Sequence, residues 1–150
     1  MKLTIHPLES VMATGQAMGR LAVTYCLDAV SLSCLSLSAL QAEIRSWCYR
    51  ADPKGTEWVQ RPMATIKGLS PFRDCDDRAI VVGAWAELAG LPFRFVAVGH
   101  LPGKPFHVFC EVQMDGQWFV ADATYPTDRP NFPKHWGHRQ VIFDRSQYAH

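Results

Sequence analysis

The pattern of apolar and polar positions changes along the chain, from a helical period in the first part to an alternating period later. Apolar residues at helical spacing predict an amphipathic helix over residues 36–50. Residues 1–34 show a weaker pattern, and we expect a helical lead-in there. Residues 57–69 read as a connection between helices.

A stronger helix is predicted over residues 75–89. Its side chains are apolar nearly all round, which is typical of a central helix that is covered on several sides. Capping and turn residues mark its start and its end: Asp74, Asp76, Asp77, Gly90 and Pro92. Cys75 therefore lies at the positive end of a helix dipole, a common way of making a thiol nucleophilic.

Beyond this helix the apolar residues alternate with polar ones, which predicts β-strands. The predicted strands span residues 93–98, 106–113, 117–123 and 141–143. Asp115-Gly116 is a strong hairpin turn between the second and third of these strands. Helices followed by an antiparallel sheet indicate an α+β fold, in one domain of 150 residues.

The hairpin turn fixes which residues share a face of the sheet. A two-residue turn pairs Met114 with Gln117 and, further along, Phe109 with Asp122. His107 is two residues from Phe109, so it lies on the same face as Asp122, as a diagonal neighbour about 7–8 Å away. The alternative is a histidine on a half-exposed strand and an aspartate that only forms a turn.

Composition excludes several classes of protein. With 15 basic and 14 acidic residues, the net charge of +1 offers no attraction to nucleic acid. The apolar segment 21–40 contains Asp28 and several serines and follows twenty ordinary residues, so we expect neither a membrane span nor a signal peptide.

The cysteines give a further indication of the compartment. The five thiols are odd in number and form no CxxC pair, which favours a reducing compartment over a disulfide scaffold. We therefore expect a cytoplasmic protein. Cys26, Cys34, Cys48 and Cys110 are interpreted as core thiols.

Four motifs occur in an order that resembles the transglutaminase-like superfamily. They are Arg73-Asp74-Cys75-Asp76-Asp77-Arg78-Ala79, Ala89-Gly90-Leu91-Pro92, Phe106-His107-Val108-Phe109 and Trp118-Phe119-Val120-Ala121-Asp122-Ala123-Thr124. The resemblance is strongest to small bacterial and phage-encoded cysteine peptidase-like members. It covers residues 36–125, leaving 1–34 as a lead-in and 126–150 as a tail. Arg73 departs from the family's usual glycine, and Ala123 from its usual proline.

The resemblance implies a papain-like fold with Cys75 as nucleophile, His107 as general base and acid, and Asp122 as the residue that orients His107. It implies a peptide or protein substrate, and hydrolysis or acyl transfer without a required cofactor. It also implies a location in the cytoplasm of a bacterium or a phage-infected cell, with association with a virion as an alternative. The alternative is a non-catalytic module of the same fold that binds a protein partner, for instance in phage assembly.

Three carboxylates around Cys75 oppose its ionisation, because nearby negative charge raises the pKa of a thiol. Either Asp74, Asp76 and Asp77 pair with Arg73 and Arg78, or a cation lies among them. Some bacterial members of the family hold calcium beside the cysteine, so the resemblance implies calcium at Asp74 and Asp76 as a hypothesis. The alternative is helix capping with surface ion pairs. A zinc site at His135 and His138 is a weaker hypothesis than a surface loop, since no cysteine pair accompanies them.

Overall fold

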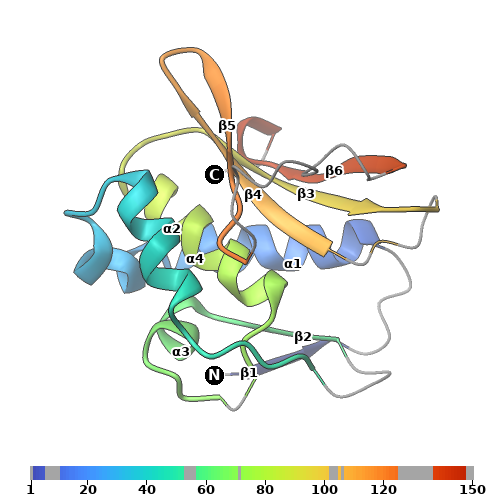
Figure 1. The fold of residues 1–150 in the computed structure, drawn as a ribbon, viewed down its shortest axis with the longest axis horizontal. Helices are drawn as coiled ribbons and strands as arrows, with labels where there is room; N and C mark the ends of the chain where they lie inside the picture. The colour runs from blue at the N-terminus through green and yellow to red at the C-terminus, as the bar shows by residue number, and fades with distance from the viewer. Residues whose placement is uncertain are drawn as a thin grey trace.

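The computed structural model describes residues 2–5, 11–52, 57–70, 72–101, 105, 107–124 and 137–147, which combine helices with antiparallel strands (Figure 1). The elements are β1 (Lys2–Ile5), α1 (Val11–Thr24), the 3-10 helix η1 (Cys26–Leu32), α2 (Leu37–Arg45), β2 (Glu57–Gln60), α3 (Pro62–Ile66), α4 (Cys75–Leu88), β3 (Phe93–Gly99), β4 (His107–Met114), β5 (Gln117–Ala121), β6 (His138–Asp144) and the 3-10 helix η2 (Arg145–Gln147). The predicted α+β class is confirmed. The predicted connection over 57–69 instead contains β2 and α3.

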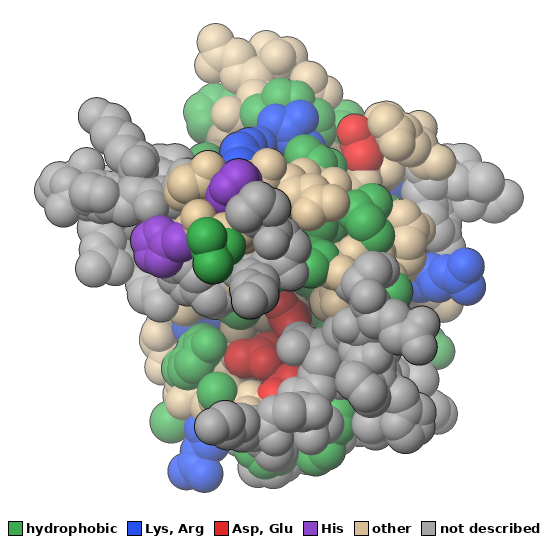
Figure 2. Space-filling model, turned by 90° about the vertical axis from the view of Figure 1, so that its right-hand side faces the viewer, with side chains coloured by type: hydrophobic (Ala, Val, Ile, Leu, Met, Phe, Trp, Pro, Cys, Tyr) green, Lys and Arg blue, Asp and Glu red, His purple; other side chains and the backbone are tan. Residues whose placement is uncertain are grey.

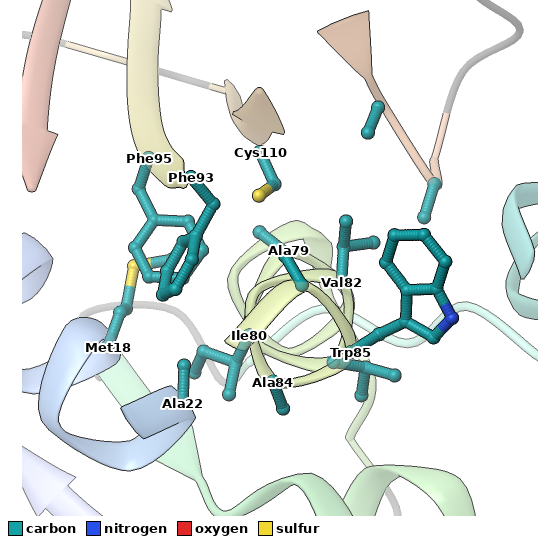
Figure 3. Packing of buried hydrophobic residues seen from close by; sticks show 14 of the residues in the cluster. Met18, Ala22, Ala79, Ile80, Val82, Ala84, Trp85, Phe93, Phe95 and Cys110 are labelled. Carbon is teal, nitrogen blue, oxygen red and sulfur yellow. The ribbon is translucent and has the colours of Figure 1, made fainter. Parts of the chain in front are cut away.

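Helix α4 is the central element, as its apolar sequence predicts. Its residues from Asp76 to Ala86 are all buried, and its side chains radiate toward other elements in every direction (Figure 3). The helix lies between the sheet and the β1–β2 ribbon, next to α1 (Figure 1). A capping box starts it: Asp74 Oδ1 accepts from the Asp77 N–H, and Asp77 Oδ2 accepts from the Asp74 N–H. Gly90, at φ +73°, follows its end.

The main sheet has the strand order β5-β4-β3-β6, with every neighbouring pair antiparallel. Met114 pairs with Gln117 across the turn, as predicted, and the ladder continues to Cys110 opposite Ala121. The turn residues Asp115 and Gly116 have φ values of 53° and 78°, so both adopt the left-handed conformation of a tight hairpin turn.

The first and last parts of the described chain pack against each other. Strand β6 pairs with β3 with a register shift between Phe95 and Val96, which leaves Ile142 as an extra residue. Helix α1 crosses β6 through Gly15 and Gly19. A Cβ atom on Gly15 would overlap the Ile142 carbonyl, and one on Gly19 would overlap the Phe143 ring. These glycines let the helix approach the strand closely.

The apolar segment 21–40 is not one helix: it contains the end of α1, η1 and the start of α2. Its Asp28 is buried and accepts two hydrogen bonds from Arg61, at 2.7 and 2.8 Å, and one from the Met63 N–H. The bond from Arg61 is the main reason why the pKa of Asp28 is lowered. Within the described residues no single helix meets the length and hydropathy needed to cross a membrane. Only η1 and α2 taken together meet these criteria, and the two helices are bent by 93° relative to each other.

Two of the four thiols predicted to lie in the core are at the surface instead. Cys110 is fully buried, as predicted, and Cys26 is half-buried, but Cys34 and Cys48 are exposed. The reason is that each follows the end of a short helix, where the chain turns at the surface. No described cysteine is paired in a disulfide.

We expect Gly15→Ala to lower the free energy of unfolding by about 1–3 kcal/mol, since the added methyl group displaces β6 from α1. Alanine normally stabilises a helix more than glycine does. A loss of stability would therefore come from the close approach of α1 to β6. Urea unfolding measures it. Gln16→Ala, exposed on the same helix, is the control and should change stability by less than about 0.5 kcal/mol. Equal stability of both variants would contradict the packing argument.

Candidate active site at the start of helix α4

His107 and Asp122 form a buried pair at the end of the β4–β5 hairpin. His107 is the first residue of β4 and is 4% exposed, and Asp122 directly follows β5 and is 1% exposed. His107 Nε2 lies 2.6 Å from Asp122 Oδ2. The predicted diagonal neighbours therefore make a direct contact, and the prediction that they share a face is confirmed.

Both the carboxylate and the backbone carbonyl of Asp122 accept hydrogen bonds. Its Oδ1 accepts from the Thr124 N–H at 2.7 Å. Its backbone carbonyl accepts from Gln41 Nε2 at 3.1 Å and from Arg45 Nη1 at 3.4 Å, both from α2. Because the backbone and the carboxylate are both fixed, Asp122 can hold the His107 ring in one orientation.

Cys75 is the first residue of α4. It is half-buried and packs against the main core, and its Sγ lies 3.7 Å from Asp76 Oδ1 as a weak donor. One turn later along the helix, Arg78 donates from Nη1 to the Ala123 carbonyl at 3.1 Å. Ala123 follows Asp122, so Arg78 connects the helix that bears the thiol to the strand end that bears the histidine's partner.

Of the predicted triad, His107 and Asp122 are in direct contact. Cys75 is the first residue of α4, the helix whose Arg78 binds the carbonyl of Ala123, next to Asp122. The side chains of β4 alternate, so that Val108 and Cys110 belong to the core around α4, whereas His107 shares the other face with Phe109. The rings of His107 and Phe109 are 5.9 Å apart.

Three carboxylates gather beside Cys75: Asp52, Asp74 and Asp77 each place one oxygen within 4.8 Å of the others. Figure 2 shows acidic side chains near the middle of one face of the molecule. Asp76 lies outside this group and contacts the thiol. Asp52 comes from the segment before β2, where the sequence predicts only a turn, and its Oδ2 accepts from the Trp58 N–H.

The electrostatics of this acidic group are unfavourable without a positive partner. Burial, together with the negative charges of Asp74 and Asp52, raises the pKa of Asp77 well above 3.8. Asp77 is 1% exposed. Its Oδ1 and the buried Oδ1 of Asp52 have no hydrogen-bond partner among the described residues. A proton or a bound cation would relieve this repulsion.

The two neighbouring arginines do not neutralise these carboxylates. Arg73 donates to the carbonyls of Thr65 and Ile66, and Arg78 donates to those of Trp47 and Ala123. Within the described part of the chain, neither forms an ion pair with Asp74, Asp76 or Asp77. The predicted pairing of aspartates with arginines is therefore wrong, because both guanidinium groups bind backbone carbonyls.

Other predicted residues add little to the site. His138 is exposed at the start of β6, and His135 lies outside the described residues. The sequence analysis did not identify Asp52, Gln41 or Arg45 as site residues. Each is far along the chain from its partner, so only the tertiary structure reveals them.

We expect Asp77→Asn to stabilise the protein at pH 7.5 in a buffer that contains a metal chelator. A gain of about 1 kcal/mol in the free energy of unfolding corresponds to a rise in Tm of about 2–4 °C. A raised pKa means that folded Asp77 retains a proton that the unfolded chain has lost. Wild-type stability therefore increases as pH falls from that raised pKa toward 3.8. The asparagine keeps the capping oxygen but no charge, so the difference between the variants should shrink at lower pH.

Thermal unfolding followed by circular dichroism between pH 5 and 8 measures this difference. Asp115→Asn, in the exposed hairpin turn, is the matched control and should show no pH-dependent gain. A difference between Asp77→Asn and wild type that is the same at every pH would contradict the assignment.

Comparisons of the chain with family models, with curated proteins and with solved structures found no match. The functional argument therefore depends on the site itself.

Proposed function

We propose that the protein is a cysteine-dependent amide hydrolase or acyl transferase of the transglutaminase-like, papain-like type, acting on a peptide or protein. Cys75 is the nucleophile, His107 the general base and acid, and Asp122 the residue that orients His107. The observation that carries the proposal is the buried 2.6 Å contact between His107 and Asp122, joined through Arg78 to a helix that begins with a cysteine.

The pair has the chemistry that the reaction needs. Asp122 binds Nε2 of His107, which leaves Nδ1 as the ring nitrogen to exchange a proton with the thiol. A buried carboxylate stabilises the imidazolium that forms when the ring takes this proton. A histidine that served only packing would not need a buried anion at hydrogen-bond distance.

In the proposed reaction the proton of Cys75 moves to His107, and the thiolate attacks the carbonyl carbon of an amide. The N–H groups at the start of α4 stabilise the oxyanion. The C–N bond breaks, the amine leaves with the proton from His107, and a thioester remains on Cys75. Water or a second amine then attacks the thioester, gives its proton to His107 and releases the thiol.

A binding module without catalysis is the second candidate. Two observations favour it: Asp76 contacts the thiol directly, and His107 lies on the face of β4 opposite to the core around α4. In that case the site would serve as a surface for a protein partner. The reactivity of Cys75 distinguishes the two functions.

We expect iodoacetamide to alkylate Cys75 at least tenfold faster than Cys34 or Cys48 in the native protein. Cys34 and Cys48 are exposed, whereas Cys75 is half-buried. If accessibility to the reagent alone set the rates, Cys34 and Cys48 would react faster than Cys75. Only an activated thiolate reverses it. Mass spectrometry of peptides after brief labelling at pH 7 measures the three rates.

His107→Ala should remove the advantage of Cys75 and leave the rates of Cys34 and Cys48 unchanged. His138→Ala, at an exposed histidine of β6, is the matched control and should have no effect. If Cys34 or Cys48 reacts first in the wild-type protein, the binding module becomes the preferred function.

We also propose that calcium binds Asp52, Asp74 and Asp77, rather than Asp74 and Asp76. Calcium takes oxygen ligands at about 2.3–2.6 Å, so oxygens on opposite sides of one ion lie about 5 Å apart. One oxygen of each carboxylate lies within 4.8 Å of the others, and Asp52 Oδ1 and Asp77 Oδ1 have no hydrogen-bond partner among the described residues. When bound, the cation would supply the positive charge that offsets the carboxylates beside Cys75.

We expect millimolar calcium to raise Tm of the wild-type protein by several degrees and to give a binding heat in calorimetry. Asp52→Asn and Asp77→Asn should abolish both effects. Asp76→Asn is the matched control, and it should retain both because Asp76 lies outside the group. If Asp76→Asn loses calcium binding while Asp52→Asn keeps it, the ligands are those implied by the resemblance instead.

A further inference from the structure

Arg78 is a buried charge whose contacts the proposed reaction does not use. It lies in α4, three residues after Cys75, and is 3% exposed. Among the described residues it has no carboxylate partner in an ion pair, and its Nε has no hydrogen-bond acceptor. A guanidinium in such a place costs stability, and packing alone would be better served by an apolar side chain.

The guanidinium connects three segments that are distant in the sequence. Nη1 donates to the Ala123 carbonyl at 3.1 Å, and Nη2 donates to the Trp47 carbonyl at 2.7 Å. Its central carbon lies 5.2 Å from the centre of the Tyr49 ring. The planar fork of arginine suits this task, because its two nitrogens reach two acceptors in fixed directions.

The connection matters because of what each segment carries. Ala123 follows Asp122, whose carboxylate contacts His107. Arg78 is on the same side of the helix as Cys75, since residues three apart are neighbours on a helix surface. Burial lowers the pKa of Arg78, and the charges of Tyr49, Cys75 and Asp122 raise it again, whereas Arg73 lowers it further. Two of these groups, Cys75 and Asp122, belong to the proposed triad.

We propose that Arg78 is a positioning residue that holds the Asp122–Ala123 strand end against the first turns of α4, so that the His107–Asp122 pair is presented to Cys75. The effect of Arg78 on catalysis rests on the proposed function. Its effect on the placement of Asp122 does not.

Arg78→Met and Arg78→Lys test the inference, with two readouts. The first is the rate of iodoacetamide alkylation of Cys75 at pH 7.5. The second is the nuclear magnetic resonance signal of the His107 ring protons, which reports the contact with Asp122. We expect Arg78→Met to slow alkylation at least tenfold and to shift the His107 signals. Arg78→Lys should restore part of both, because the ammonium keeps the charge and one donor.

Arg145→Met is the matched control. Arg145 also contacts α4, but near the end of the helix away from Cys75, where its Nε lies 2.6 Å from Glu87 Oε2. We expect it to change the alkylation rate less than twofold. The rate of exposed Cys34 and the Tm check that each variant is folded.

The outcomes separate the two proposals. Wild-type His107 signals and wild-type alkylation in folded Arg78→Met overturn the role of Arg78. If Arg78→Met does not fold, wild-type behaviour of Arg78→Lys, with both signals unchanged, equally overturns it. Slow alkylation of wild-type Cys75 relative to Cys34 overturns the proposed function. The His107 signals of the variants then still decide whether Arg78 positions Asp122.

Discussion

Burial of the first turns of α4 is the constraint on which the site depends. A helix leaves its first N–H groups without partners in the helix, and here those groups lie in the interior with three aspartates and an arginine nearby. The capping box between Asp74 and Asp77 satisfies two of the backbone groups at this end. It also concentrates negative charge where the chain has little solvent to screen it.

The same burial explains why each charged side chain has a specific partner or a shifted pKa. Asp122 is fixed by α2, by Thr124 and by His107, and Arg78 binds the carbonyls of Trp47 and Ala123. One oxygen of Asp77 accepts a hydrogen bond in the capping box, and the other has no hydrogen-bond partner among the described residues. Its raised pKa is the consequence. The repulsion at Asp77 and the buried charge of Arg78 are therefore two parts of one electrostatic problem.

Local signals made much of this structure predictable. Helix α4 could be predicted because its cap, its apolar run and its terminal glycine are contiguous, and the hairpin because Asp115-Gly116 fixes the register. That register was sufficient to pair His107 with Asp122. Asp52 could not be predicted as a neighbour of Asp77, since 24 positions separate them in the sequence. The exposed positions of Cys34 and Cys48 were missed because apolar neighbours in sequence do not show where the chain turns at the surface after a short helix.

The cost of burying these polar groups is a stronger argument for a functional role than the geometry of the site is. A buried His–Asp pair, an arginine with no carboxylate partner among the described residues and a group of three carboxylates each cost stability relative to apolar residues of similar size. A protein that needed only a stable core has no reason to connect all three to the first turns of one helix. In the proposed function, the ionisation of Cys75 is controlled by balanced charges. On one side are Arg78 and the start of the helix, and on the other are Asp74, Asp76 and Asp77. In such a balance a single proton or cation in the acidic group changes the field at the thiol, so the acidic group is better understood as part of the site than as a separate surface feature.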